Sequence, residues 1–310
     1  MKRKNFKSIA GLTLIEILIG VVVSSIMMAA IYTTYSIVNT TYSQVLEKAK
    51  VSRSSRDIIE LLIRDTRMAG FKYYLGDNDR GLPKESYLEF VGGASSIKES
   101  HDPIVIIPQQ LGHSIEDTIP TPPQKHNLLD SCCDKIHIVY DDFNQNDDTQ
   151  PYKRYKLTYF ARPLSDTDRD GNIINQRYGI YKSKISWEQD LGQETGRWVP
   201  DCSECYHNEL IRDHVEDMEF IALDKDGKVL TPYPNTLTEE SRRNLYKIRA
   251  IDIRIAFISE KPFFRFESRQ GKERQLTGFS RTPRSFSDRN LRDNVVVTVY
   301  TRNIVGQEIF

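Results

Sequence analysis

The stretch Gly11–Ile19 reads GLTLIEILI and opens an apolar run that continues to about Tyr32. A short basic leader precedes it and contains Lys2, Arg3, Lys4 and Lys7. The run of about 21 residues is long enough for a helix to cross a bilayer. One carboxylate, Glu16, interrupts it, and an ionisable side chain inside a membrane costs roughly 2.5–3.5 kcal/mol on insertion scales. Such a position requires a partner, which we expect to be the amine created if the chain is cut after Gly11.

Two simpler interpretations explain less of this segment. A cleaved secretory signal has an apolar core of only about 7–15 residues, followed by a small-x-small site. Here the run is longer, and its end, Ile26–Ala30, places methionine where such a site requires a small residue. A plain signal anchor fits the length and the basic flank. It explains neither Gly11 at the junction nor Glu16 at its offset.

A helical pattern continues past the apolar run to Gly70, a natural stop signal. Residues 33–69 contain neither proline nor glycine. One face at helical spacing carries Val38, Tyr42, Val45, Ala49, Ser52, Ile59, Leu62, Ile63 and Thr66. A helix from Leu12 to Ala69 would be ~87 Å long at 1.5 Å per residue. We expect its second half to pack on a sheet, because the stripe does not keep the a/d repeat of a coiled-coil stalk.

These segments resemble parts of a known family. The basic leader, Gly11 and Glu16 resemble the N-terminus of a type IV prepilin. Residues 61–71, LLIRDTRMAGF, resemble the L-x-R-D-x-R-x-A-G-[YF] stretch that ends the long helix of PilW-type minor pilins. The related large minor pseudopilins of type II secretion share some of it. Ile248–Ile258 and Leu291–Asn303, which ends in T-x-x-x-R-N, are similar to that family's last strands.

The resemblance implies a maturation step and an assembly role. A dedicated peptidase on the cytoplasmic face would cut after Gly11 and methylate the new N-terminus at Leu12. Glu16, the fifth mature residue, would then help to dock the subunit into a helical filament. Major pilins often bend this helix with a proline near the end of the apolar run, where this chain has Thr33-Thr34. The helix shape therefore stays open at this point.

The resemblance also predicts the architecture and the location of the chain. We expect an α+β fold with a leader at 1–11, a transmembrane or filament-core helix at 12–32, its amphipathic continuation at 33–70 and a β-rich head at 71–310. The chain would lie in the inner membrane with a periplasmic head, and then in a pilus at the cell surface. Its partners would be other minor and major pilins, the prepilin peptidase and the inner-membrane assembly platform.

The head reads as a β-rich domain with antiparallel sheet. Candidate strands, alternating or running apolar between turn signals, are Ile104–Ile107, Lys135–Tyr140, Tyr155–Ala161, Tyr178–Ile185, Val215–Leu223, Ile248–Ile258 and Val295–Ile304. The segment Leu210–Leu223 also fits a helix, but the turn sequence Asp224–Gly227 after it favours a strand. Long polar loops are expected at Gly76–Ser86, Gly112–Asn127, Asp141–Gln150 and Tyr233–Arg243.

The four cysteines stand as Cys132-Cys133 and Cys202-x-x-Cys205. A head outside the cytoplasm favours disulfides, and four cysteines allow three pairings. Because a bridge between adjacent residues is strained, we expect two bridges that join Cys132 and Cys133 to Cys202 and Cys205. Each would close a loop of about 70 residues and add roughly 4 kcal/mol in the chain-entropy model.

Two other interpretations of the cysteines fit less well. A zinc site would combine Cys202 and Cys205 with His207 and His214, but the histidine spacing is off the usual finger pattern. A redox C-x-x-C needs a thioredoxin-like βαβ context, which does not surround this one.

A calcium loop is predicted at Asp166-x-Asp168-x-Asp170-Gly171. Alternate acidic residues with glycine at position six let oxygens converge on one hard cation. Position 12 is Arg177 where an EF-hand needs a bidentate Glu, so Asn175, backbone carbonyls or another loop would complete the shell. The competing interpretation is a solvated acidic turn between two strands. The Asp141–Asp148 loop is a weaker second candidate.

Composition and missing motifs exclude several classes of function. Lys+Arg and Asp+Glu balance at 43 each, so no electrostatic footprint for nucleic acid is present. The chain has no P-loop, no H-E-x-x-H, no G-x-S-x-G and no dinucleotide fingerprint. We therefore expect no enzymatic activity and no required cofactor, with Ca²⁺ as the one optional ion.

The sequence thus predicts a minor pilin, a structural and assembly subunit of a type IV pilus. The large head is too bulky to tile a slender filament densely, which favours a tip or initiation position. One alternative is a large minor pseudopilin of a type II secretion system. The other is a calcium-dependent adhesin or binding module that uses the pilin stem as its carrier.

Overall fold

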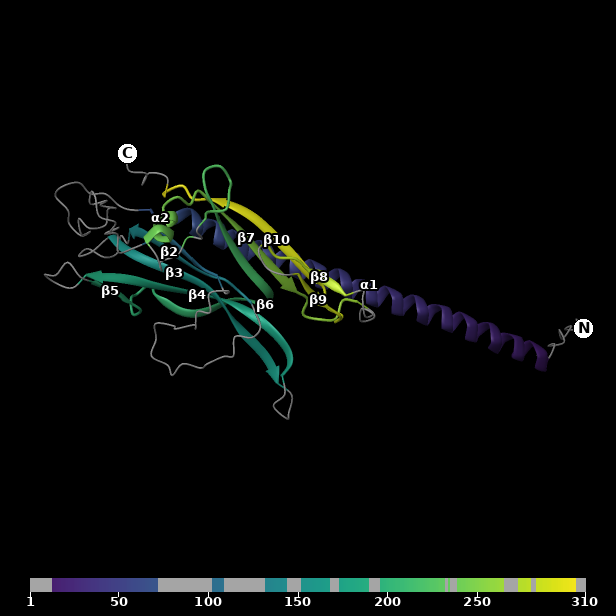
Figure 1. Cartoon of the computed structure of the whole chain (residues 1–310). Coiled ribbons are helices and arrows are strands. Elements are labelled where there is room, and N and C mark those ends of the chain that lie inside the picture. Colours follow the sequence, from purple (N-terminus) through teal and green to yellow (C-terminus); the bar gives the residue numbers. More distant parts are fainter. Residues whose placement is uncertain are drawn as a thin grey trace, which may run out of the picture. The chain divides into compact units, whose positions relative to one another are not determined.

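A computed structural model describes residues 13–71, 102–108, 132–143, 152–167, 173–189, 196–231, 234, 239–264, 273–279 and 283–304. The chain divides into two compact units, residues 1–49 and 50–310. Figure 1 shows the course of the chain.

Helix α1 runs from Leu14 to Met68. Both ends of the helix carry residue types that commonly begin or end helices. Thr13 precedes the first turn, and Gly70 follows the last turn with φ +74°, a left-handed conformation that glycine adopts without a Cβ penalty. The helix predicted over 12–69 is therefore confirmed across its described residues.

The rest of the described chain is mostly strand. The strands are β1 (Ile104–Ile107), β2 (Lys135–Phe143), β3 (Tyr152–Thr167), β4 (Ile173–Gln189), β5 (Gly196–Val199), β6 (Tyr206–Leu223), β7 (Ala250–Ile258), β8 (Arg274–Leu276), β9 (Arg284–Phe286) and β10 (Arg292–Tyr300). A short helix, α2, spans Glu239–Leu245. The expected α+β class, a long N-terminal helix with a β-rich head, is confirmed.

The main sheet has eight strands, with the order β1-β2-β3-β4-β6-β7-β10 and β5 paired with β4. Its strand pairs are antiparallel, and β8 and β9 form a separate two-stranded sheet. Strand β6 is irregular: its register against β4 shifts between Tyr178 and Lys184, and against β7 at Val215–Asp217. Asn208 and His214 in this strand have positive φ, which fits the bulges at these shifts.

The core of the second unit lies between one face of the sheet and residues 50–68 of α1 (Figure 1). Ile58 and Leu62 of the helix join a cluster of alternate strand residues, including Ile136, Leu157 and Ile253. Each of these side chains is at most 2% exposed. Because side chains alternate across a strand, the residues between them lie on the opposite face.

All seven predicted strands are present, and most are longer than predicted. Strand β1 has the predicted bounds, whereas β2 extends to Phe143 into the segment expected to be a loop. Helix α2 begins inside another predicted loop, 233–243. Strands β5, β8 and β9 were not predicted, because their three or four residues mix polar and apolar types and lack the continuous apolar run that marks β1.

The turn predicted after β6 is confirmed. The Asp224 carboxylate accepts hydrogen bonds from the backbone N–H groups of Asp226 and Lys228 at 2.8 and 2.9 Å. Gly227 has φ +74°. The chain then returns beside β6, where Leu230 N–H donates to the Ala222 carbonyl at 3.1 Å. The segment 210–223 is accordingly a strand and not a helix.

Candidate functional site

Thr13 and Glu16 form a reciprocal capping box at the start of α1. The Glu16 Oε2 atom accepts hydrogen bonds from the backbone N and the Oγ1 of Thr13, each at 2.9 Å. In return the Glu16 N–H approaches Thr13 Oγ1 at 3.4 Å and the Thr13 carbonyl at 3.1 Å. A threonine with glutamate three residues later satisfies two helix-end donors in this way.

This box gives Glu16 a local role that sequence reasoning missed. The signal was present as T-x-x-E directly before an apolar run. A carboxylate in the first turn also interacts favourably with the helix dipole. Gly11 and Leu12, where cleavage and methylation are expected, lie outside the described residues.

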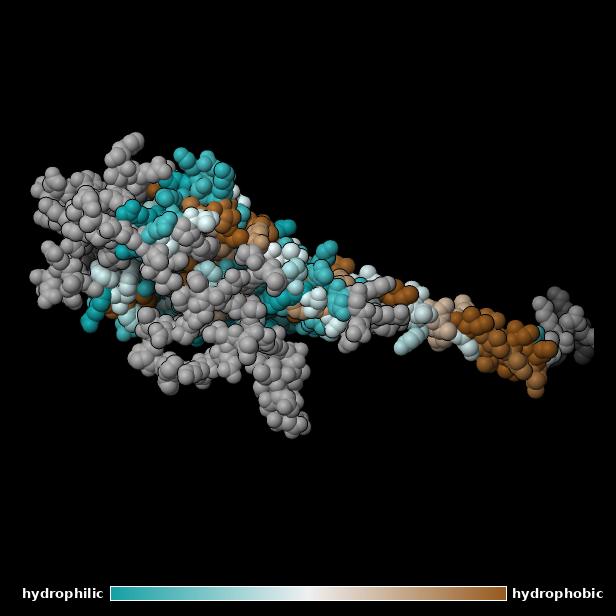
Figure 2. Space-filling model, in the orientation of Figure 1, coloured by the Kyte–Doolittle hydropathy of each residue, from teal (hydrophilic) through white to brown (hydrophobic). Residues whose placement is uncertain are grey.

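The first unit carries an unusually apolar and open helix surface. Large apolar side chains along α1 are exposed, among them Leu14 (80%), Ile19 (57%), Met28 (71%) and Ile31 (64%). Figure 2 shows this as a continuous hydrophobic surface on the N-terminal part of the helix. An 18-residue window of α1 has a mean hydropathy of 2.5 and none of it is buried. Within the described residues, α1 is the one helix long and apolar enough to span a membrane.

Hydroxyl side chains along this helix bond to its own backbone. Each donates to the carbonyl four residues earlier, and the pairs are Ser25–Val21, Thr33–Ala29, Thr34–Ala30, Thr40–Ser36, Thr41–Ile37 and Ser43–Asn39. Such bonds leave no hydroxyl proton unsatisfied in an apolar surrounding. They let polar residues continue the helix beyond the apolar run without exposing an unpaired donor.

A shallow notch marks one side of the apolar helix. It is lined by Ile17, Gly20, Val21, Ser24, Ser25 and Met28. A Cβ added at Gly20 would meet no atom within 4 Å. Gly20 and Ser24 are spaced as small-x-x-x-small, the pattern with which membrane helices approach each other closely. The notch therefore suits a second helix.

In the second unit, Asp65 fastens the end of α1 to the sheet. Its Oδ2 accepts a hydrogen bond from Tyr159 Oη at 2.5 Å and lies 2.6 Å from Lys182 Nζ. Asp65, Tyr159 and Lys182 are all buried. Burial, together with the charge of Asp65, raises the pKa of Tyr159 well above its usual range, so the phenol stays a donor. The D in the R-D-x-R-x-A-G motif is thus a helix–sheet anchor.

The two family-like motifs meet at Gly70. The Gly70 N–H donates to the Val139 carbonyl at 2.8 Å, and a Cβ at Gly70 would lie 3.1 Å from Ile304. The Asn303 Nδ2 donates to the Arg67 carbonyl at 2.9 Å. Asn303 therefore satisfies a carbonyl that the helix end leaves without an intrahelical partner. Segments more than 230 residues apart in the chain are joined here.

The expected pairing between the two groups of cysteines is wrong in this structure. Cys132 is bonded to Cys133, and Cys202 to Cys205 with a Cα–Cα distance of 4.9 Å. The physical reason is strand β6. Cys205 immediately precedes the start of β6. Cys133 lies toward the other end of β6, because the N–H of the next residue, Asp134, donates a hydrogen bond to the Met218 carbonyl. Twelve strand residues span roughly 40 Å, far beyond the ~7 Å limit between bridged Cα atoms.

The same strand separates the ligands of the alternative zinc site. His207 and His214 are seven residues apart in β6, which is ~23 Å at 3.3 Å per residue. His207 Nε2 lies 3.0 Å from the Pro200 carbonyl oxygen, and His214 Nδ1 lies 3.0 Å from Asp213. One tetrahedral zinc ion cannot take both histidines together with the bridged Cys202 and Cys205.

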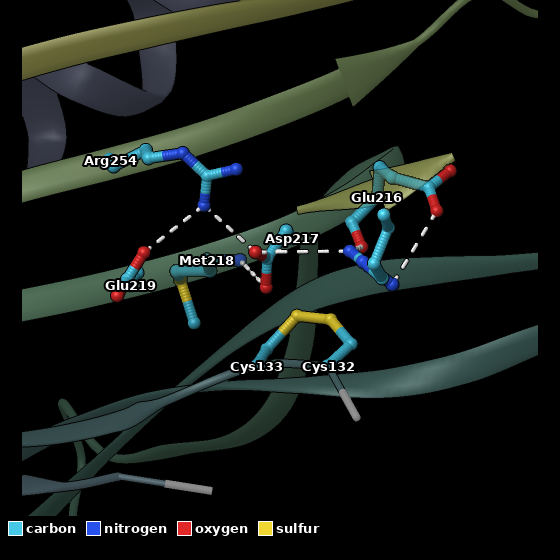
Figure 3. Close-up of a disulfide and its surroundings, with 8 residues drawn as sticks. Cys132, Cys133, Glu216, Asp217, Met218, Glu219 and Arg254 are labelled. Carbon is cyan, nitrogen blue, oxygen red and sulfur yellow. Dashed lines mark hydrogen bonds and ion pairs between the residues drawn. A yellow bond between two sulfur atoms is a disulfide. The ribbon is translucent and has the colours of Figure 1, made fainter. Parts of the chain in front are cut away.

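Another group of metal-capable atoms lies beside the first disulfide (Figure 3). Ligand atoms of Cys132, Cys133 and Asp217 lie within 4.8 Å of one another. The two sulfurs are bonded to each other, and Asp217 Oδ2 is 2.8 Å from Arg254 Nη1. Arg254 also lies 3.2 Å from Glu219. These donors are committed to a disulfide and a buried ion-pair network, so this group does not fit a metal ion.

The calcium prediction rests on the connection between β3 and β4. Asp166 and Asn175 are direct register partners at the ends of these strands. Asp168 and Asp170 lie outside the described residues, as do the side chains of Asp166 and Asn175. The calcium site therefore stays a prediction. In the second candidate loop, Asp141 belongs to β2 and its carboxylate binds Arg154 at 2.6 and 3.0 Å.

Comparison with known proteins leaves the family open. No protein-family model matches the chain, and no curated protein matches it. Among solved structures, a type IV-like pilin from Thermus thermophilus is similar at 11% sequence identity and a TM-score of 0.40. That similarity covers 82% of this chain and 98% of the other. A likeness at this level does not establish a family, so the function rests on the residues described above.

Proposed function

We propose that the chain is a pilin-like subunit that matures by cleavage between Gly11 and Leu12 and assembles through its apolar helix. The observation that carries this proposal is the junction itself. A basic leader ends at Gly11, and a T-x-x-E box then opens a helix whose large apolar side chains are exposed. A surface of this kind needs an apolar surrounding, first lipid and then neighbouring helices.

Within this proposal the finer role is that of a PilW-type minor pilin. The motif around Asp65 and Gly70 and the ending at Asn303 support it, because they meet to close the helix against the sheet. Other minor and major pilins, the prepilin peptidase and the inner-membrane assembly platform are the proposed partners. A tip or initiation position follows from the size of the head.

The proposal also sets the location of the protein. It lies in the inner membrane with the head in the periplasm before assembly, and in the pilus at the cell surface afterwards. The hydropathy of α1 supports the membrane stage. Filament fractions with the chain along the whole shaft at high copy would contradict the tip position.

The first experiment is intact mass and N-terminal sequencing of the protein purified from its native membrane. The proposal expects a chain that begins at methylated Leu12, with the mass of two disulfides. A start at Met1 in a host with an active prepilin peptidase would reduce the segment to a signal anchor and end the pilin proposal.

A second experiment separates the two roles of Glu16. Glu16→Gln keeps a side chain that serves a capping box but removes the charge that neutralises the N-terminal amine. Thr13→Val removes the capping hydroxyl and keeps the charge. If the charge matters, Glu16→Gln loses pilus incorporation and Thr13→Val retains it. The opposite result would assign Glu16 a capping role alone.

The notch at Gly20 offers a matched pair of variants for the assembly step. Gly20→Leu fills the notch, whereas Val22→Leu adds one methylene at a position that does not line it. Both keep the helix apolar and membrane-inserted. We expect Gly20→Leu to lower the amount of the chain in sheared pili and Val22→Leu to leave it unchanged. Equal incorporation of the two variants would exclude the notch from helix packing.

The type II secretion alternative shares this chemistry and differs in the machinery. Crosslinking from the head to pilus subunits or to secretion pseudopilins in native membranes separates the two. Capture of pseudopilins alone would replace the pilus proposal with the secretion one.

A further inference from the structure

One face of the head gathers basic groups that neither helix packing nor the disulfides use. On the face of β2 and β3 turned away from α1, Lys135 and His137 alternate with core residues of β2, and Lys156 lies on β3. The register places His137 opposite Thr158 and Val139 opposite Lys156. Directly opposed residues have Cβ atoms about 5 Å apart, and diagonal neighbours about 7–8 Å. His137 and Lys156 are therefore diagonal neighbours, and Lys135 lies two residues from His137 on the same face of β2.

Polar hydroxyls continue this area across the sheet. His137 Nδ1 lies 2.8 Å from Thr158 Oγ1, and Thr158 is the register partner of Ser183 on β4. The Ser183 Oγ in turn accepts a hydrogen bond from the Asn208 N–H at 3.0 Å. The strands thus carry a row of hydrogen-bonding groups through the basic cluster.

The acidic residue nearest in register to this cluster already forms an ion pair with an arginine. Between 135 and 141 of β2 and between 154 and 160 of β3, the one acidic residue on this face is Asp141. It is fully buried and forms a bidentate pair with Arg154, at 2.6 and 3.0 Å. Asp141 therefore does not neutralise Lys156 or His137.

A nearby negative charge would stabilise the charged forms of Lys156 and His137. Burial, followed by repulsion from Lys135, lowers the pKa of Lys156 to about 8. Burial also lowers the pKa of His137, and the charges of Lys135 and Lys156 add to the effect. All three residues remain partly exposed, so a ligand can reach them. Groups held together against their own repulsion occur at functional sites more often than elsewhere.

Aromatic rings form the walls of the cluster. Lys156 Nζ lies 4.7 Å from the centroid of Trp198, which packs edge-on against Trp187 at 5.2 Å. Lys135 Nζ lies 6.0 Å from the centroid of Phe160. The rings limit solvent around the lysine heads and hold their stems, which strengthens any charge-assisted bond that they make.

We propose that this face, centred on Lys156, His137 and Thr158, binds a compact oxyanion group. Lys156 donates to the anion, His137 donates through Nε2 or as the imidazolium, and Lys135 adds attraction at longer range. The oxyanion is a sulfate or phosphate group, or the carboxylate of an acidic sugar, since these share the acceptor chemistry that the donors require. The site is independent of the pilin role proposed for the helix.

The test is isothermal titration of the full chain in detergent micelles at pH 7. Sulfate and glucuronate are the two ligands, because they separate a tetrahedral dianion from a sugar carboxylate. We expect saturable binding that Lys156→Met weakens about 10-fold, the loss of one charge-assisted hydrogen bond. His137→Gln keeps the bond to Thr158 and should weaken binding less. Lys225→Met, in the exposed turn after β6, removes the same charge elsewhere and should change nothing.

A second readout keeps the proposal testable if one variant unfolds. The His137 ring signals, assigned by their absence in His137→Gln, should titrate at higher pH when sulfate is present, because a bound anion raises the pKa of the imidazole. The groups that face His137 are Lys135 on β2 and Lys156 and Thr158 on β3. The site would be overturned if neither ligand binds saturably. It would also be overturned if Lys156→Met and Lys225→Met bind with equal affinity and sulfate does not shift the pH at which His137 titrates.

Discussion

The two units of this chain treat polar and apolar side chains in opposite ways. In residues 14–49 the large apolar side chains are exposed, and six serine and threonine hydroxyls bond to the backbone of their own helix. Among the described residues of 50–304, most large apolar side chains are buried in one core, and so are charged ones such as Asp65, Lys182 and Arg254. The second unit supplies its own partners for these charges, whereas the first needs an apolar surrounding from outside the chain.

The largest expected effect comes from breaking the buried anchor in the second unit. Asp65→Ala leaves Lys182 as a buried charge without its closest carboxylate. Removing one partner of such a pair costs about 3–5 kcal/mol in the free energy of unfolding. Urea unfolding of the full chain in micelles, followed by tyrosine fluorescence, measures it. Arg64→Ala is the control, since Arg64 is 67% exposed in its pair with Asp65 and should cost under about 1 kcal/mol.

Two glycines with the same backbone angle sharpen the comparison between packed and open positions. Gly70 and Gly227 both have φ +74°, so alanine costs about 1–2 kcal/mol at either position. At Gly70 the new Cβ would also lie 3.1 Å from Ile304 and 3.2 Å from Pro103, whereas at Gly227 it meets nothing. Gly70→Ala should therefore lower the unfolding free energy more than Gly227→Ala. Equal losses would mean that the helix–sheet junction accommodates the added Cβ without a further loss of unfolding free energy.

The cysteine pairing gives a smaller effect with a clear chemical readout. Cys202–Cys205 closes a loop of only four residues, which the chain-entropy model values at roughly 2 kcal/mol instead of roughly 4 for a 70-residue loop. Cys202→Ser should lower the unfolding free energy by about that amount. Peptide mapping without reduction should find Cys202 and Cys205 linked within one segment. A peptide that joins residue 132 or 133 to residue 202 or 205 would restore the pairing expected from sequence.

The smallest expected effect is at an exposed ion pair, Lys50–Glu260, at 3.1 Å. Both side chains are about half exposed, so Lys50→Ala should cost under about 1 kcal/mol. The hydrogen bond from Lys50 lowers the pKa of Glu260 below its usual value of 4.5. The pair's contribution is therefore present above that pH and is lost as the pH falls through the lowered pKa. Unfolding of wild type and Lys50→Ala at pH 7 and pH 3 should converge at the lower pH.

Much of the fold was readable from local patterns. The helix, the stop at Gly70, seven strands and the turn at Asp224 each depend on residues close together in the chain. Short elements such as β5 and α2 were not predicted, because a few residues do not show a helical or strand periodicity. At the candidate site, the apolar run predicted a special role for the carboxylate of Glu16, whereas its hydrogen bonds to Thr13 were not predicted although T-x-x-E stands in the sequence.

By itself, the sequence determined a long apolar helix that requires an external apolar partner, and a β-rich head behind it. These follow from hydropathy, periodicity and stop residues, which act over a few turns or strand positions. Only the tertiary structure decided how the cysteines pair, how Asn303 reaches the end of α1 and which basic groups share a sheet face. Those contacts join residues far apart in the chain, so they depend on strand order and register, which no local pattern encodes.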